Sequence, residues 1–258
     1  IHGVVGPAGD GYVVGKAMTA PQAEASHMPQ VQAFAKNGVD MISAITMNYV
    51  EEAIGVAIAA AKSNLPVVVS YTVETNGALP SGQSIADAIE QTDREVHAAT
   101  GQLPLYYMIN CAHPDHFSSQ LTVQADWKSR IGGIRANASR LSHAELDASE
   151  TLDDGDPEEF GRLYAQLARQ LPDLKVIGGC CGTRPDHIAQ LAEMSRDLKP
   201  KERPVRKPAD VGAHGCAPSP LWRASGEEGG SRAAPARTFV RTPTSARLTE
   251  QRTAAVGA

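Results

Sequence analysis

The sequence predicts an α/β fold built on a parallel sheet, and three observations lead to this prediction. Apolar runs of strand length alternate with amphipathic helical stretches about six times along residues 1–200. The run over residues 67–73 is continuous and rich in β-branched side chains, which is typical of a parallel strand buried on both faces. Polar or reactive side chains directly follow the strands: Thr46, Glu74, Cys111, Asn137, Cys180 and Cys181. A βα barrel or an open α/β sheet places its active site at this end of its strands.

The first half of the chain is expected to hold three strands and three helices. Thr19 can cap a helix that has Pro21 near its start and that ends at Asn37-Gly38. Ser84 can cap another helix, with Asp87 three residues later as an acidic variant of the capping box. The expected strands cover residues 1–5, 39–45 and 67–73, and the first two helices cover residues 19–36 and 51–62.

The second half of the chain repeats this alternation. Pro104 precedes an apolar run, and Pro157 stands where a helix can begin. A short helix is expected after Cys111, and a polar loop rich in His, Ser and Asp covers residues 137–156. The expected strands cover residues 105–109, 131–136 and 174–177, and the helices cover residues 157–171 and 186–198.

Composition excludes several classes of protein. The 258 residues are 42% hydrophobic and 21% charged, as in an ordinary globular protein. A net charge of −5 argues against general nucleic-acid binding. The sequence contains no run of about 18 apolar residues, so we expect no membrane span. Four cysteines in a chain of this size do not make a disulfide framework, which favours a reducing, cytoplasmic location.

The composition changes near residue 200. Residues 201–258 are rich in Pro, Arg, Ser, Gly and Ala, and they carry ten Lys/Arg against five Asp/Glu. We expect a barrel-type domain over residues 1–200 and a disordered, low-complexity tail over residues 201–258. The tail could contact an anionic partner or be a plain solvated extension, and Cys216 within it is not expected to join a site.

Three cysteines, Cys111, Cys180 and Cys181, follow two separate strands and form an incomplete tetrahedral set. Structural zinc sites usually have four protein ligands, whereas catalytic ones keep three and leave one position open. Three thiolates around Zn²⁺ give a net charge of −1, so that a substrate thiol bound fourth would stay a good nucleophile. This ligand set favours alkylation of a thiol over hydrolysis. Buried apolar cysteines or a redox pair are the alternatives.

Two histidines just beyond Cys111 are further candidate ligands. His113 and His116 belong to the stretch His-Pro-Asp-His. A histidine in such a loop is more often a surface or supporting residue than a ligand, and both interpretations stay open.

The stretch Gly178-Gly179-Cys180-Cys181-Gly182-Thr183, with Asn110-Cys111 upstream, resembles the homocysteine S-methyltransferase family. The resemblance implies a (β/α)8 TIM barrel in which Cys111, Cys180 and Cys181 bind zinc and no other residue is catalytic. It implies methyl transfer from a small-molecule donor to a thiol, most simply homocysteine, to give methionine. Thr46 and Asn137 would lie beside the substrate. The donor could be S-methylmethionine, S-adenosylmethionine, betaine or a folate.

Two of the departures from the family pattern bear on the substrate and on the barrel. Ile45 stands where the family usually has a Glu that holds the amino group of the substrate, and Glu74 or Glu145 could replace it. The chain starts inside an apolar run at Ile1, which the resemblance places at the third barrel strand. We therefore expect a barrel lacking its first two βα units. The alternative function is an inactive or metal-binding truncated relative.

Overall fold

Six parallel strands form the single sheet of the computed structural model, which describes residues 1–122, 124–171 and 173–197. These residues belong to one compact unit, Ile1–Lys201. Each strand pairs with the next one along the chain, so that the order in the sheet is the order in the sequence. The strands are β1 (His2–Val5), β2 (Met41–Met47), β3 (Val67–Tyr71), β4 (Tyr107–Asn110), β5 (Ile131–Ala136) and β6 (Val176–Gly179).

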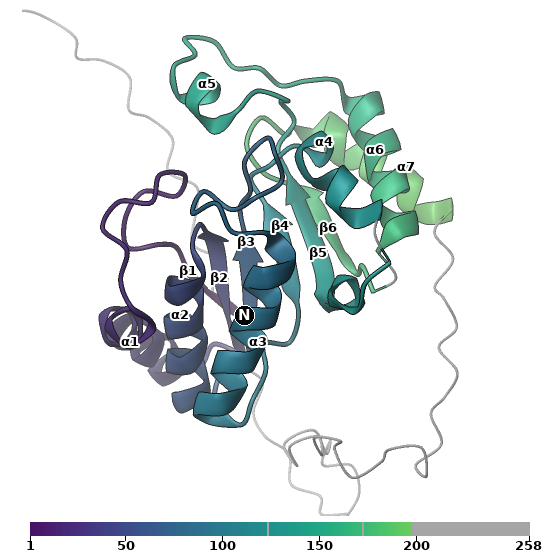
Figure 1. Ribbon diagram of the computed structural model, residues 1–258. Coiled ribbons are helices and arrows are strands. Elements are labelled where there is room, and N and C mark those ends of the chain that lie inside the picture. Colours follow the sequence, from purple (N-terminus) through teal and green to yellow (C-terminus); the bar gives the residue numbers. More distant parts are fainter. Residues whose placement is uncertain (123, 172, 198–258) are drawn as a thin grey trace, which may run out of the picture. The chain divides into compact units, whose positions relative to one another are not determined.

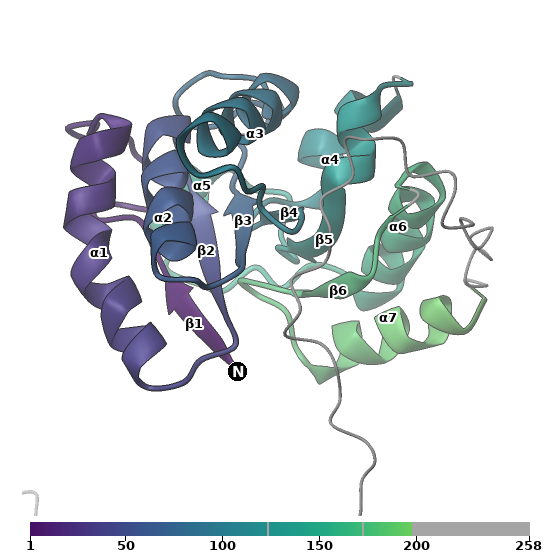
Figure 2. The ribbon, with the colours of Figure 1, turned by 90° about the horizontal axis from the view of Figure 1, so that it is seen from below.

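The longer helices follow the strands along the chain and lie on the outer side of the sheet (Figure 2). Figure 2 shows the strands following an arc with the helices around it, which is the arrangement of part of a TIM-barrel wall. The predicted α/β class with a parallel sheet is therefore confirmed, as a half-barrel of six strands. The helices are α1 (Ala20–Lys36), α2 (Val50–Lys62), α3 (Ile85–Thr100), α4 (Pro114–Phe117), α5 (His143–Asp147), α6 (Pro157–Gln170) and α7 (Pro185–Asp197).

The core lies between the sheet and these helices. All five residues of β3 are buried, as expected for a strand with a neighbour on each side and both faces covered. Helix α2 is Ala-rich and almost entirely buried, which lets α1 pack closely against it. At Gly55 a Cβ would lie 2.5 Å from the Cβ of Ala23, so only glycine allows this approach.

The helix caps follow the sequence signals. The Ser84 hydroxyl accepts a hydrogen bond from the N–H of Asp87 (3.1 Å) at the start of α3, and Gly101 ends that helix with a left-handed φ of 69°. At the start of α1, the N–H of Thr19 donates to Oε1 of Gln22 (3.0 Å). Helices predicted from capping and periodicity were therefore placed correctly to within a few residues.

Several boundaries differ from the predictions because strand pairing sets them. β2 begins at Met41, opposite His2, and extends past Ile45 through an irregularity between Ala44 and Met47. β3 ends at Tyr71, its last paired residue. Gly178 and Gly179 belong to β6 because they pair with Arg135 and Ala136, so the chain leaves the strand later than predicted.

The segment expected to be a loop over residues 137–156 contains the short helix α5. It lies beyond the carboxyl ends of the strands, at the top of Figure 1. No helix in the described part of the chain is both long and apolar enough to cross a bilayer. The predicted disordered tail, residues 201–258, lies outside the described residues.

Candidate metal centre

Three cysteine thiols converge at the carboxyl edge of the sheet. Cys111 follows β4, and Cys180 and Cys181 follow β6, with β5 between the two strands. Their sulfur atoms all lie within 4.8 Å of one another. Cys111 is buried, Cys180 half-buried and Cys181 exposed, so the cluster (hereafter the cysteine cluster) opens to solvent on the Cys181 side.

Cys111 is held in an unusual backbone conformation. Its φ of 55° is left-handed, which is uncommon for a residue with a side chain and costs about 1–2 kcal/mol. Its N–H donates to the carbonyl of Arg135 (3.1 Å), and its own carbonyl accepts from Nδ2 of Asn137 (3.1 Å). Strain of this kind persists only where the surroundings impose it, and it gathers at functional sites.

Asn137 joins the two cysteine-bearing loops. While its Nδ2 donates to the carbonyl of Cys111, its Oδ1 accepts from the N–H of Cys181 (3.1 Å). The side chain is 2% exposed. Asn137 therefore fixes the position of Cys181 relative to Cys111, and its predicted contact with a substrate stays a prediction.

The turn after β6 directs both neighbouring thiols to the cluster. The N–H of Cys180 donates to the carbonyl of Ala136 (2.8 Å), which continues the sheet ladder by one residue. Gly182 then takes a left-handed φ of 75°. Gly179 must be glycine for another reason, since a Cβ there would lie 2.2 Å from Oγ1 of Thr183.

The three thiols do not ionise independently. Hydrogen bonds from the Cys180 and Cys181 thiols lower the pKa of Cys111. The interaction with Cys111 is in turn the largest effect that raises the pKa of Cys180 and that of Cys181. One thiolate is favoured and the next two are opposed by the charge already present, so a cation is needed for all three to be thiolates together.

The geometry fits a single metal ion. Tetrahedral zinc with Zn–S bonds of about 2.3 Å places its sulfur ligands about 3.8 Å apart. The observed separations of up to 4.8 Å need only small side-chain movements to reach that value. Cys111, Cys180 and Cys181 could thus hold a soft divalent ion and leave one position free.

Thr46 is tied to the cysteine cluster through Asn110. Thr46 also has a left-handed φ, 61°, which is a clear outlier for a β-branched residue. Oδ1 of Asn110 accepts from the N–H of Thr46 (3.0 Å), and Nδ2 of Asn110 donates to its hydroxyl (2.7 Å). The two strained residues, Thr46 and Cys111, are therefore linked by the residue that precedes Cys111.

Tyr12, His143 and Glu74 lie over the cysteine cluster. Tyr12 lines the same hollow as Cys181, and its ring stacks on His143 with centroids 4.0 Å apart. Nε2 of His143 lies 2.5 Å from the carbonyl oxygen of Cys111, and Nδ1 lies 3.2 Å from Oε1 of Glu74. The sequence alone did not single out Tyr12 or His143. The motif Ser142-x-x-Glu145, a capping box, was the available signal for the helix that carries His143.

The two histidines beyond Cys111 do not join the cluster. Among the described residues, the group whose ligand atoms lie close enough for one metal consists of the three cysteines. Nδ1 of His113 accepts from the N–H of Asp115 (3.2 Å), and burial lowers the pKa of His113 to about 4. Nε2 of His116 lies 2.8 Å from the carbonyl oxygen of Arg140. Both therefore support the local fold.

A hollow of about 430 Å³ opens beside the cysteine cluster. Its lining includes Tyr12, His143 and Cys181 together with the acidic residues Asp147, Glu150 and Asp153. This hollow gives a small molecule direct access to Cys181, and its charged lining is acidic.

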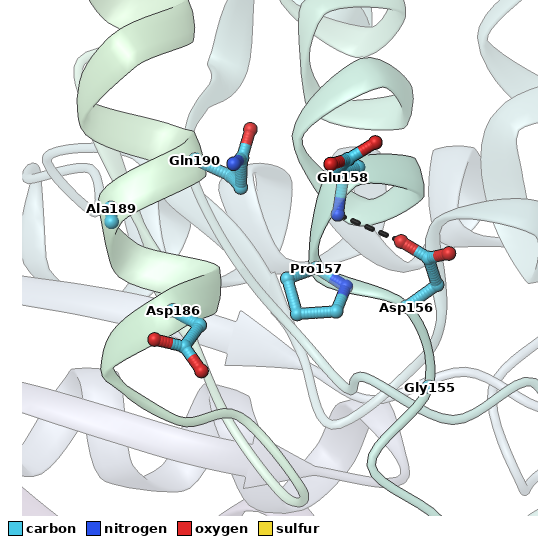
Figure 3. Close-up of a pocket in the computed structure, with 7 residues that line it drawn as sticks. All are labelled: Gly155, Asp156, Pro157, Glu158, Asp186, Ala189 and Gln190. Atoms are coloured by element: carbon cyan, nitrogen blue, oxygen red, sulfur yellow. Dashed lines mark hydrogen bonds between the residues drawn. The ribbon is translucent and has the colours of Figure 1, made fainter.

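A second hollow, about 620 Å³, lies between the first turns of α6 and α7 (Figure 3). Its charged side chains are Asp156, Glu158 and Asp186, and Asp156 already caps α6 by accepting from the N–H of Glu158 (2.8 Å). These carboxylates oppose the anions that helix N-termini otherwise attract. Among the described residues no cysteine lines this hollow, and we assign no chemistry to it.

Comparison with known proteins identifies a family for the chain. The family described as homocysteine S-methyltransferase matches residues 1–195. The chain belongs to this family. The match includes β4, β6 and all three cysteines of the cluster.

Relatives of this homocysteine S-methyltransferase family member include two methionine synthases. That of Mycobacterium tuberculosis is 25% identical over 155 residues, which cover 58% of this chain and 12% of the relative. That of Mycobacterium leprae is 30% identical over 138 residues, which cover 53% of this chain and 10% of the relative. The chain thus spans only 10–12% of the length of these curated relatives.

Solved structures of the homocysteine methyltransferase MmuM from Escherichia coli share the fold. The apo form gives a TM-score of 0.52 at 20% identity, covering 75% of this chain and 61% of that one. The metallated form gives the same TM-score and identity, covering 75% and 59%. At this level of identity the likeness concerns the fold.

Proposed function

We propose that this chain transfers a methyl group to a thiol, with homocysteine as the acceptor, and that Cys111, Cys180 and Cys181 hold zinc for this reaction. The observation that carries the proposal is the convergence of three cysteine sulfurs within 4.8 Å at the carboxyl edge of the sheet. Family membership and the existence of a metallated form of MmuM support it. We take the six strands to be part of a (β/α)8 barrel. The complete ligand set favours this function over that of an inactive relative.

The chemistry follows from the ligand set. Zinc bound by three thiolates would keep a fourth, substrate sulfur deprotonated and nucleophilic near neutral pH. The thiol proton leaves to solvent when the acceptor binds, and the sulfur lone pair then forms the new S–C bond as the bond between the methyl carbon and the donor breaks. Asn137 and the backbone turn at Gly182 would hold the ligand sulfurs in place while this occurs.

The hollow beside Cys181 indicates the charge of the donor. Its carboxylates, Asp147, Glu150 and Asp153, attract a cation and repel an anion. We infer a methyl donor that carries positive charge on the atom bound to the methyl group, such as a sulfonium or a quaternary ammonium. The sulfur or nitrogen atom of such a donor becomes neutral when it loses the methyl group, whereas a folate brings negative carboxylates into an acidic hollow.

The acceptor would lie between the cysteine cluster and the end of β2. Thr46 and Asn137 border this space in the proposal. Ile45 offers no charge for an ammonium group. Oε1 of Glu74, however, lies 3.2 Å from Nδ1 of His143, whose Nε2 lies 2.5 Å from the carbonyl oxygen of Cys111. Glu145 is the weaker substitute because its carboxylate already accepts from the N–H of Ser142 (2.8 Å). Glu74 is therefore our candidate for the group that holds the amino end of homocysteine.

Metal analysis and turnover test the proposal together. The full chain and the variants Cys111→Ala, Cys180→Ala and Cys181→Ala are purified and their zinc content is measured. Cys216→Ala is the matched control, because it removes a thiol outside the proposed ligand set. We expect about one zinc per chain in wild type and in the control, and loss of zinc and of homocysteine methylation in the other three. Equal zinc content in all five proteins would refute the proposal.

A further inference from the structure

His187, in the first turn of α7, is a histidine with no exposed surface (0%). Its ring packs edge-on against Phe160 of α6, with the ring centroids 5.2 Å apart. Both ring nitrogens have backbone partners: Nδ1 accepts from the N–H of Arg184 (3.1 Å), and Nε2 lies 2.9 Å from the carbonyl oxygen of Asp154. Because an N–H can only donate and a carbonyl can only accept, these two bonds assign a neutral ring with its proton on Nε2. The imidazole therefore joins two separate backbone segments.

The bond on the Nδ1 side fixes the end of the turn that follows β6. The carbonyl of Arg184 accepts from the N–H of Ile188 (3.3 Å) at the start of α7, which makes Arg184 the N-cap of this helix. His187 bonds back to the N-cap N–H from the third helical position, as Glu or Gln does in a capping box. One residue earlier, the N–H and the hydroxyl of Thr183 donate to the carbonyl of Cys180 (3.3 and 2.7 Å). The Nδ1 bond thus continues the hydrogen bonding of the cysteine-bearing turn.

The bond on the Nε2 side fixes the loop that supplies part of the acidic lining of the hollow beside Cys181. Residues 149–153 line this hollow, and Asp154 follows them directly. Arg184 also reaches the loop, with Nη1 2.6 Å from Oδ2 of Asp154, but both side chains are partly exposed and such ion pairs contribute little. The buried bond from the imidazole is therefore the stronger link to this loop.

The two linked segments meet at the hollow. Cys181 and Gly182 line it from the turn after β6, and Asp153 lines it from the loop. The backbones are in close contact there, since a Cβ on Gly182 would lie 3.0 Å from the carbonyl oxygen of Asp153. By bonding to both segments, His187 sets how the acidic loop lies against the cysteine-bearing turn.

We propose that His187 is a positioning residue for the methyl donor, because it holds the acidic loop over residues 149–154 in place beside the cysteine-bearing turn. This inference rests on the proposed function, since it takes the hollow to be the place where a cationic donor binds. A methyl carbon that must reach a sulfur atom at the cysteine cluster tolerates little displacement of the carboxylates that bind the donor. His187 contacts neither the donor nor the metal in this proposal and acts through the backbone of Asp154 and Arg184.

Two amide substitutions separate the roles of the two ring nitrogens. In His187→Asn the side-chain oxygen takes the place of Nδ1 and keeps the bond to Arg184, but the side chain is too short to reach the carbonyl of Asp154. In His187→Gln the amide nitrogen takes the place of Nε2 and restores the bond to Asp154, and Gln is also an ordinary residue at this position of a capping box. His187→Gln is therefore the rescue variant.

Thr92→Val is the matched control for a structural loss elsewhere. Thr92 is fully buried on α3, where its hydroxyl lies 2.6 Å from that of Tyr71. No residue of α3 lines the hollow beside Cys181. This substitution therefore removes a buried hydrogen bond without touching either linked segment.

Hydrogen–deuterium exchange of the metal-free full chain tests the link itself. Loss of one hydrogen bond corresponds to about a three- to tenfold change in a local opening equilibrium. We expect residues 149–155 to exchange faster by this factor in His187→Asn and at the wild-type rate in His187→Gln. Thr92→Val should speed exchange in residues 85–100 instead. Wild-type exchange of residues 149–155 in His187→Asn would overturn the inference.

Kinetics of the zinc-loaded proteins test the effect on the donor. We expect His187→Asn to raise the KM for S-methylmethionine about three- to tenfold and to leave the KM for homocysteine and the zinc content unchanged. His187→Gln and Thr92→Val should match wild type in all three measurements. An unchanged KM for S-methylmethionine, or an equal rise in both KM values, would show that His187 does not position the donor.

The two measurements distinguish failure of this inference from failure of the proposed function. If wild type turns over no donor, the proposed function fails, and the same comparison is made with the dissociation constant for S-methylmethionine from isothermal titration calorimetry. Weaker binding by His187→Asn than by wild type and His187→Gln would then support the inference. Equal or absent binding in all three proteins would overturn it.

Discussion

Substituting Asn137 tests how the two cysteine loops are held together. Asn137→Ala removes the hydrogen bond to the carbonyl of Cys111 and the acceptor for the N–H of Cys181. The carbonyl of Cys111 keeps His143 as a neighbour, but the N–H of Cys181 loses the partner described above. Two lost hydrogen bonds, one of them leaving a donor unsatisfied, are worth about 2–4 kcal/mol of unfolding free energy.

Both stability and metal affinity should respond. A loss of that size lowers the melting temperature of a domain of this length by roughly 4–16 °C. Supporting residues around metal ligands typically contribute about 10- to 100-fold in metal affinity, and we expect a loss in that range for zinc. Differential scanning calorimetry of metal-free protein and competitive zinc titration measure the two effects separately.

Asn37→Ala is the matched control for this substitution. Asn37 ends α1, and its exposed Nδ2 donates to the carbonyl of Ala33 (2.8 Å), away from the cysteines. We expect it to change the unfolding free energy by about 0.5 kcal/mol or less and to leave zinc affinity unchanged. If Asn137→Ala behaves like Asn37→Ala in both measurements, Asn137 does not join the two loops.

Three further predictions concern the buried pair of Glu52 and His27, the packing of α1 on α2, and the methyl donor. Burial acts to raise the pKa of Glu52, but the hydrogen bonds with His27 and Ala8 outweigh burial, and the pKa is lowered. The stability that the Glu52 carboxylate contributes is therefore present above pH 4.5, its ordinary pKa, and is lost as the pH falls through the lowered pKa. Glu52→Gln should cost about 1.5–3 kcal/mol at pH 7 and flatten that acid dependence in denaturant titrations. Gly55→Ala should destabilise the protein by about 1–3 kcal/mol, because the new methyl group meets α1, whereas Gly6→Ala has open space and should have little effect on the urea midpoint. Glu150→Gln should raise the KM for a sulfonium donor severalfold and leave the KM for a folate unchanged or lower it. Equal effects on the two KM values would exclude charge selection by the hollow.

Sequence signals predicted the alternation of strands and helices because each element carries its own local pattern. The β-branched run at β3 and the cap at Ser84 act within a few residues, and both have the expected structure. Strand ends were less predictable, since pairing with a neighbour decides them. β2 runs past Ile45 because Met47 still pairs with Tyr71.

The cysteine cluster could be anticipated for a topological reason. In a parallel sheet the carboxyl ends of all strands lie at one edge, so residues that follow different strands can meet. Cys111, Cys180 and Cys181 do so across β5. The sequence left His113 and His116 open as further ligands, although it favoured a surface or supporting role, and their hydrogen bonds and burial show that both serve the local fold.

The position of Tyr12 and His143 over the cysteine cluster could not be predicted in the same way. Tyr12 lies in the loop after β1 and His143 begins α5 after β5, so their stacking depends on how these two segments fold back over the sheet edge. The left-handed φ of Thr46 and of Cys111 was equally hidden, because neither residue type favours that conformation. These features arise from tertiary contacts, such as the hydrogen bonds between Asn110 and Thr46.

X-ray absorption at the zinc edge tests the central claim most directly, since it counts the sulfur atoms bound to the metal. In the zinc-loaded full chain we expect three sulfur ligands at about 2.3 Å, from Cys111, Cys180 and Cys181. Adding homocysteine should raise the count to four, because the acceptor sulfur takes the open position. Fewer than three sulfur ligands in the free protein, or no change when homocysteine is added, would contradict the account.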